Sequence, residues 1–265
     1  YNQASLDDRL AYARLLLKNG EYKQAEKEFR ILVDSMPDNI LAQNGLKSAQ
    51  MAPNWKKAGS RYQVKKMDVF TSRRADYSPM LLGDEYEQLY FTSTRNDAQG
   101  DELSGITGTK AGDIFLSEKD DKGKWSRPEA IATGLNTDYD EGACCFTPDG
   151  KEMYLTQCVT DPASPRFAQI VTSSRSDAAW GKVQKLEITQ DTLSTYAHPA
   201  ISPDGEWLYF VSDMPGGMGG YDIWRVRITS SGLGGVENLG APIVRRFVMV
   251  GSKTSICCSC QDSTM

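Results

Sequence analysis

The chain has 265 residues, with 30 Lys and Arg, 35 Asp and Glu, and 40% hydrophobic residues. This composition is typical of globular proteins and excludes a disordered or collagen-like chain. No stretch of 18 apolar residues occurs, so the sequence predicts no membrane-spanning helix. No charged start is followed by an apolar segment, so we expect a secretory signal peptide to be absent or already removed.

Charge is distributed unevenly along the chain. Residues 1–76 carry 14 basic and 9 acidic side chains, whereas residues 77–243 carry 13 basic and 25 acidic ones. Nucleic-acid binding needs a basic surface, so the acidic second part predicts no nucleic-acid partner. The basic first part either docks against the acidic second part or forms a solvated surface with unrelated charge.

Apolar residues recur with helical spacing over residues 5–50. Gly20 marks the end of a first run and Pro37 the end of a second, because glycine favours helix termini and proline cannot continue a helix. Asp38 or Asn39 then caps a third run. The pattern predicts a helical hairpin followed by one further helix.

The spacing of the hairpin resembles that of a tetratricopeptide repeat. The residues that carry this resemblance are Gly20, Tyr22, Ala25, Phe29 and Pro37. The aromatic residue of the first helix is missing, since Arg9 stands in its place. One repeat cannot bury its own apolar face, so we expect this segment either to cap the rest of the chain or to bind a partner protein.

From Tyr77 onward the sequence contains three copies of one unit. Each copy has a turn signal, an apolar run, a second apolar run and a tryptophan- or proline-containing stretch, in the same order. The first apolar runs are residues 89–93, 153–156 and 208–212, and the second are 112–115, 169–171 and 221–224. A strand-rich unit of roughly 50 residues repeated in tandem predicts a β-propeller.

Each sub-motif has a structural reason. The Pro-Asp-Gly sequences at 148–150 and 203–205 predict tight turns, since proline restricts φ and glycine accepts a positive φ. The Leu-Tyr-Phe type of run predicts a strand buried on both faces. Propellers close with four to eight blades, so three units predict an incomplete propeller with an open edge, preceded by a short α-helical segment. The expected fold class is therefore mainly β.

The three units resemble PD40 repeats, the WD40-like units of TolB-type propellers that are named for their Pro-Asp pair. The glycine-rich segment 214–224, together with segments 72–79 and 140–146, resembles the propellers of OmpA-family proteins from Bacteroidetes. Such proteins carry an N-terminal tetratricopeptide segment, a PD40 propeller and a C-terminal OmpA-like domain that binds peptidoglycan. The nearest functional resemblance is to PorE-type periplasmic components of the type IX secretion system.

This resemblance implies a non-enzymatic periplasmic scaffold that is associated with the outer membrane and binds other envelope proteins. It implies peptidoglycan binding only through a C-terminal domain that we do not expect in this chain. The alternatives are a ligand- or glycan-binding propeller and the regulatory propeller of a hydrolase. No Gly-x-Ser-x-Gly nucleophile motif occurs, so we expect neither catalytic residues nor a cofactor.

These patterns predict four segments. They are a tetratricopeptide-like segment (1–52), a linker with a leading strand (53–76), three PD40 blades (77–243) and a tail (244–265). The tail lacks the repeat pattern, and we interpret it as foreign to the fold, from a frame shift or a truncated gene. Its cysteines at 257, 258 and 260 are too closely spaced for a typical zinc site, so we expect no metal.

Two sets of residues are candidates for a structural or functional role. Cys144 and Cys158 flank the turn at 148–150, and their positions predict a disulfide across or between strands, with two buried free thiols as the alternative. Arg95, His198 and Trp224 are candidates to line the propeller funnel and to contact a ligand or partner. His198 is the only histidine, and a hydrogen-bonded residue on an inner strand is its other interpretation.

Overall fold

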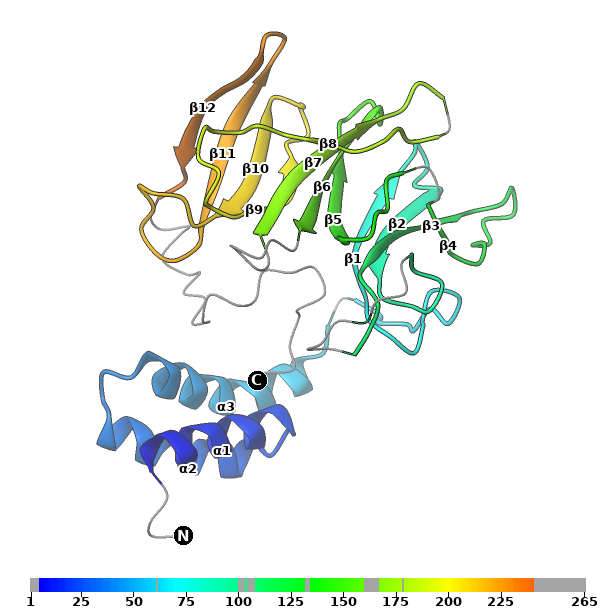
Figure 1. Cartoon of the computed structure of the whole chain (residues 1–265). Helices are drawn as coiled ribbons and strands as arrows, with labels where there is room; N and C mark the ends of the chain where they lie inside the picture. The colour runs from blue at the N-terminus through cyan, green and yellow to red at the C-terminus, as the bar shows by residue number, and fades with distance from the viewer. Residues whose placement is uncertain are drawn as a thin grey trace. The chain divides into compact units, whose positions relative to one another are not determined.

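The computed structural model describes residues 5–60, 62–99, 103, 108–131, 134–159, 167–177 and 179–240. The chain divides into two compact units, residues 1–66 and residues 67–265 (Figure 1). None of the helices within the described ranges combines the length and apolarity needed to cross a bilayer. The predicted foreign tail and its three cysteines lie outside the described residues.

The first unit consists of three helices, α1 (Leu6–Lys18), α2 (Tyr22–Ser35) and α3 (Ile40–Ala58). Helix α1 begins with a capping box, because Ser5 Oγ accepts the amide of Asp8 and the Asp8 carboxylate accepts the amide of Ser5. Asn39 caps α3 through a 3.0 Å bond from the Ala42 amide. Helix α3 continues through Pro53, so it extends beyond the segment boundary predicted at residue 52.

A small apolar core holds the helices together. Phe29 is fully buried, and a Cβ on Gly45 would lie 2.2 Å from its ring, so only glycine permits this approach of α3 to α2. Many large apolar side chains of the same unit are nevertheless exposed. Those on the helices are Leu6, Tyr12, Leu15, Ile31, Ile40, Leu41, Met51 and Trp55.

The second unit contains three four-stranded antiparallel sheets, each a meander in chain order (Figure 1). Blade 1 comprises β1 (Asp76–Leu82), β2 (Gln88–Ser93), β3 (Asp113–Glu118) and β4 (Glu129–Ala130). Blade 2 comprises β5 (Asp140–Phe146), β6 (Glu152–Val159), β7 (Phe167–Ser174) and β8 (Gln184–Lys185). Blade 3 comprises β9 (Tyr196–Ile201), β10 (Trp207–Ser212), β11 (Asp222–Thr229) and β12 (Gly232–Asn238).

Successive blades pack in the same way. The first strand of blade 2, β5, contacts β1, β2 and β3, and the first strand of blade 3, β9, contacts β5, β6 and β7. The prediction of a mainly β fold, an incomplete propeller preceded by a short helical segment, is therefore confirmed. The cores between the blades are two apolar clusters, one containing Tyr90 and Leu155 and the other Tyr154 and Phe210.

The first strand of every blade is interrupted at the same place. Ser78, Ala143 and His198 have φ values of 51°, 48° and 55°, and the register of each strand shifts around them. Such β-bulges kink a strand and re-aim its side chains. Pro79 and Pro199 follow two of these residues, at points where the ladder needs no amide donor.

The bulges also join neighbouring blades. Thr92 Oγ1 on β2 accepts the amide of Ala143 at 3.3 Å, and Thr156 Oγ1 on β6 accepts the amide of His198 at 2.8 Å. Blade 3 has Val211 at the equivalent position, opposite Ala197 on β9. The bulge leaves the backbone amide of its central residue without a partner in its own sheet. A threonine on the second strand of the preceding blade accepts that amide instead.

Burial of the second strands differs between blades. The central residues of β2 and β6 are buried on both faces, as predicted. In β10 burial alternates, because Leu208 and Phe210 pack against blade 2 while Tyr209 and Val211 on the other face are only partly buried. The prediction of burial on both faces is therefore wrong for β10.

Candidate functional site

Two of the three turns between first and second strands have the same internal bonds. In blade 2, Asp149 Oδ1 accepts bonds from Thr147 Oγ1 at 2.6 Å and from the amide of Lys151 at 3.1 Å. Gly150 closes the turn with a φ of 66°. Blade 3 repeats this arrangement with Ser202, Asp204 and Gly205. The Pro-Asp-Gly sequence therefore forms the same hydrogen-bonded turn in blades 2 and 3.

The turn of blade 1 is built differently. Gly83 has a φ of 98°, and a Cβ there would lie 2.0 Å from Oε1 of Glu87, so the Glu87 carboxylate folds over the glycine. The same carboxylate accepts the amide of Glu85 at 3.1 Å. Tyr86 adopts a φ of 54° and leaves 61% of its surface exposed.

The turns of successive blades contact one another through glycines. A Cβ on Gly150 would lie 3.1 Å from Cδ1 of Leu82, and a Cβ on Gly205 would lie 3.2 Å from Cδ of Pro148. Both glycines therefore combine a positive φ with a close neighbour, and either property disfavours a larger residue. These contacts align the turns of the three blades along one end of the sheets.

A groove of about 630 Å³ lies between these turns. Apolar side chains of the first strands contribute to it, and carboxylates and Arg175 lie among the same lining residues. The lining residues that matter for its chemistry are Met80, Leu81, Leu82, Asp84, Tyr86, Glu87, Phe146, Asp149, Arg175 and Ile201. All three blades contribute, so the groove exists only when the blades are packed together.

Arg175 is the basic side chain that lines the groove, and its guanidinium is already engaged. Its Nε donates to the carbonyl of Gly150 at 2.8 Å. The guanidinium also lies 4.8 Å from the ring centre of Trp180, a typical cation–π distance. Arg175 therefore braces the turn of blade 2.

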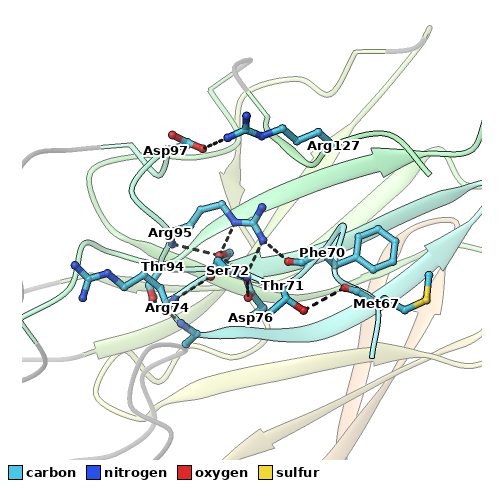
Figure 2. Close-up of polar contacts among 12 residues, drawn as sticks. Met67, Phe70, Thr71, Ser72, Arg74, Asp76, Thr94, Arg95, Asp97 and Arg127 are labelled. Carbon is cyan, nitrogen blue, oxygen red and sulfur yellow. Dashed lines mark hydrogen bonds and ion pairs between the residues drawn. The ribbon is translucent and has the colours of Figure 1, made fainter. Parts of the chain in front are cut away.

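The structure does not bring the three predicted funnel residues together. Arg95 is 9% exposed, and Figure 2 shows its guanidinium bonded to Asp76 Oδ1 and to the carbonyl of Phe70, each at 2.7 Å. It also lies 5.1 Å from the ring centre of Phe91 and 4.8 Å from that of Phe115. The prediction of a funnel contact is wrong for Arg95, because its charge and its planar face are both used inside blade 1.

Trp224 and His198 have opposite surroundings. Trp224 is 6% exposed, and its Nε1 donates to the Ser212 carbonyl at 3.2 Å, so its predicted funnel role is also wrong. His198 is exposed, and its backbone is held by Thr156. Surrounding protein desolvates the His198 ring and lowers its pKa. The funnel role of His198 stays a prediction.

The predicted disulfide is not formed, and the pairing behind it is wrong. Both Cys144 and Cys158 are buried, and neither forms a disulfide. The bulge at Ala143 shifts the register, so that Cys158 lies opposite Asp140. Cys144 packs in the cluster of Tyr90, whereas Cys158 packs in a separate small cluster. Burial raises the pKa of Cys144, so this thiol stays protonated and unreactive.

Two carboxylates near the joint of blades 1 and 2 are buried, although the acidic sequence around Glu141 is typical of a solvated loop. Glu141 is fully buried, and burial raises its pKa to about 7. It accepts bonds from the amide of Thr137 at 2.9 Å and from Gln157 Nε2 at 2.9 Å. Burial also raises the pKa of Asp113 to about 6. Asp113 begins an apolar run and Glu141 ends an acidic stretch, and neither pattern identifies a buried carboxylate. The burial of both groups follows from the packing of blade 2 on blade 1.

The groove residues were also missed. Asp84 and Glu85 lie in an acidic turn between two apolar runs. This pattern is visible in the sequence, but it is equally typical of a solvated turn without a function. Across the described ranges, no group of three or more His, Cys, Asp or Glu side chains is placed to hold a metal ion. The site is therefore best described as a groove with an apolar lining and acidic turns.

No protein-family model and no curated protein matches the chain. Similar solved structures include a puromycin-hydrolyzing peptidase of Mycobacterium tuberculosis, with 15% identity over 65% of this chain and 33% of that one and a TM-score of 0.34. A prolyl endopeptidase has 18% identity over 63% of this chain and 22% of that one, with a TM-score of 0.36. A protein of unknown function from Dyadobacter fermentans has 16% identity over 62% and 51%, with a TM-score of 0.40.

The chain spans between about a fifth and a half of the length of these three structures. With such low identities and TM-scores, what these proteins do carries no weight for this chain. The blade architecture itself is established by the three sheets and their register.

Proposed function

We propose that this chain is a non-enzymatic protein-interaction module, and that the groove between the blade turns is where it holds a segment of a partner protein. The groove carries this proposal: three blades align their turns around about 630 Å³ of space with apolar side chains at its wall. Such a volume also suits a small ligand. The exposed Leu81 and Tyr86, at 44% and 61%, favour a polypeptide that lies across the groove.

The helical unit supports the same function. Eight large apolar side chains of its helices are exposed, including Leu15 at 52%, Ile40 at 66% and Trp55 at 61%. Exposed apolar surface of this kind is a common feature of protein-binding sites. A single tetratricopeptide-like hairpin with its apolar residues in solvent is a natural contact surface for a partner.

We further propose that the partners are proteins of the bacterial cell envelope, and that the module belongs to a periplasmic scaffold associated with the outer membrane. This part of the proposal rests on the resemblance of the repeats to propellers of OmpA-family proteins, including PorE-type components of type IX secretion. The groove and the exposed helical residues are compatible with a scaffold of this type, and they would suit a protein-binding module in any compartment.

A capture experiment tests the proposed function. The purified chain, immobilised through a terminal tag, is incubated with a bacterial envelope extract, and bound proteins are quantified by mass spectrometry. We expect outer-membrane or secretion proteins to be enriched over a variant in which Leu15 and Trp55 are both changed to Ser. Equal recovery by the chain, by this variant and by an unrelated tagged protein would contradict the proposal.

A further inference from the structure

The three turns that frame the groove give it a strongly acidic edge. Residues 82–88, 147–152 and 202–207 contain seven Asp and Glu but only one basic residue, Lys151. Of these acidic residues, Asp84, Glu87 and Asp149 line the groove itself. Glu206 is partly neutralised by Arg227, whose Nη2 lies 2.9 Å from its carboxylate.

The carboxylates at the groove differ in how far they are engaged. Glu87 accepts an amide of its own turn, and Asp149 accepts two bonds within its turn. The bond from Thr147 holds the pKa of Asp149 below its usual range, so this group stays ionised at neutral pH. Asp84 is exposed and makes no hydrogen bond or ion pair in the part of the chain that the structure describes. Its charge is therefore available to a ligand.

The negative charge of the groove is not neutralised by an unengaged basic side chain among the lining residues. Arg175 is the basic residue among the lining residues, and it is held by the Gly150 carbonyl and the Trp180 ring. The groove thus combines an apolar wall, which includes Met80, Leu82 and Ile201, with negative charge at its turns. A ligand that matches both features carries positive charges next to aliphatic groups.

From this complementarity we infer that the groove binds an extended basic polypeptide segment in which Lys or Arg alternates with aliphatic residues. In an extended strand, alternate side chains point to opposite faces. One face would then place aliphatic groups against the apolar lining, which includes the exposed Leu81, while the other directs its cations to the acidic turns. This inference rests on the proposed function and specifies the chemistry of the partner.

The test uses the full chain and labelled peptides of ten residues, with fluorescence anisotropy as the readout. We expect a Lys-Leu alternating peptide to bind, a Lys-Ser peptide to bind more weakly, and a Glu-Leu peptide not to bind. Affinity should fall as salt increases, since the charges are exposed and screened. Equal binding of the Lys-Leu and Glu-Leu peptides, or binding that salt leaves unchanged, would overturn the inference.

Two pairs of variants locate the site. Asp84→Lys should weaken binding of the Lys-Leu peptide about tenfold, whereas Asp121→Lys, the same charge change on an exposed turn outside the groove, should leave it unchanged. Leu81→Ser should weaken binding severalfold, whereas Leu193→Ser, at an 88% exposed position outside the groove, should not. Thermal unfolding verifies that each variant is folded. Equal effects of the groove and control variants would refute the assignment to the groove.

The outcomes separate this inference from the proposed function. If envelope proteins are captured equally by the chain and by Asp84→Lys, and no basic peptide binds, the scaffold proposal stands and the groove inference fails. If basic peptides bind in the groove but no envelope protein is captured, the groove inference stands and the proposed function fails.

Discussion

Asp76 of blade 1 and Glu141 of blade 2 hold equivalent positions, two residues before the bulges of β1 and β5, yet their surroundings give them opposite acidities. Each accepts a backbone amide four residues upstream, from Ser72 and Thr137. The difference lies in the side chain that the next segment supplies. Blade 1 provides Arg95, two residues beyond the end of β2, whereas blade 2 provides the neutral Gln157 on β6.

The consequence appears in the pKa values. Burial pushes the pKa of Asp76 upward, but the bonds from Arg95, Ser72 and Ser93 outweigh it and hold the pKa below its usual range. Burial dominates at Glu141 and raises its pKa to about 7. A repeat therefore determines which positions meet, while the side chains placed there decide whether the buried carboxylate is charged.

The largest expected effect comes from removing the cation of blade 1. Arg95→Leu should lower the free energy of unfolding by about 3 kcal/mol, because it leaves the partly buried Asp76 without its ion pair and removes the cation–π contacts. Urea unfolding followed by tryptophan fluorescence measures this loss. Changing Asp76 to Asn in the same chain should recover part of it, since no uncompensated charge remains.

Arg127 provides a matched control for that substitution. Figure 2 shows its pair with Asp97 beside the buried pair of Arg95 and Asp76. The Arg127 and Asp97 side chains are 85% and 65% exposed, and their charged atoms are 3.6 Å apart. Exposed pairs contribute little, so Arg127→Leu should cause no measurable loss of stability. Similar losses for Arg95→Leu and Arg127→Leu would show that Arg95 has no special role.

The next effect concerns the pH dependence of stability. Because the pKa of Glu141 is raised from its unfolded value of 4.5 to about 7, its protonated form stabilises the fold fully below pH 4.5, and this stability is lost as the pH rises to 7. Between pH 5 and 7 the loss should be about 2 kcal/mol. Glu141→Gln should flatten the profile over this range, apart from a contribution of Asp113, whose pKa is about 6.

Asp76 should act in the opposite direction and in a different pH range. Its lowered pKa stabilises the fold above pH 3.8, and this contribution disappears as the pH falls through the folded value. Asp76→Asn should therefore alter the acid limb and leave the profile between pH 5 and 7 unchanged. Urea midpoints measured across this pH series provide the comparison. A wild-type profile that rises between pH 5 and 7 would contradict the assignment to Glu141.

The smallest effect tests the bonds between blades. Thr156→Val should cost about 1 kcal/mol, because the amide of His198 loses its 2.8 Å partner without a change in side-chain shape. Thr92→Val should cost less, since its bond to the Ala143 amide is longer, at 3.3 Å. Thermal unfolding can compare the stability losses of the two variants. A larger loss for Thr92→Val than for Thr156→Val would contradict this prediction.

Much of the fold could be predicted because its signals are local. The Pro-Asp-Gly turns, the cap at Asn39 and the order of strands within each unit depend on residues only a few positions apart. Such preferences act within one turn or one hairpin, so they survive without knowledge of the distant chain. The end of α3 was predicted less well, since Pro53 is accommodated inside the helix.

The candidate site could not be predicted in the same way. The disulfide between Cys144 and Cys158 failed because a single positive-φ residue, Ala143, shifts the pairing of β5 with β6. Arg95 and Trp224 were read as funnel residues, but inter-strand packing buries them. The groove depends on contacts between turns about 55 or more residues apart, such as Gly150 with Leu82.

The sequence by itself determined three repeated sheets, the turns of blades 2 and 3 and a preceding helical hairpin, because each of these follows from short-range backbone preferences and apolar periodicity. The turn of blade 1 was predicted at Ser78-Pro79, which lies inside β1, so that prediction was wrong. Tertiary structure alone decided which carboxylates are buried, which arginines are engaged and where a groove opens. Those properties depend on register, on three bulges and on the packing of one blade against the next, and no short segment of the chain contains that information.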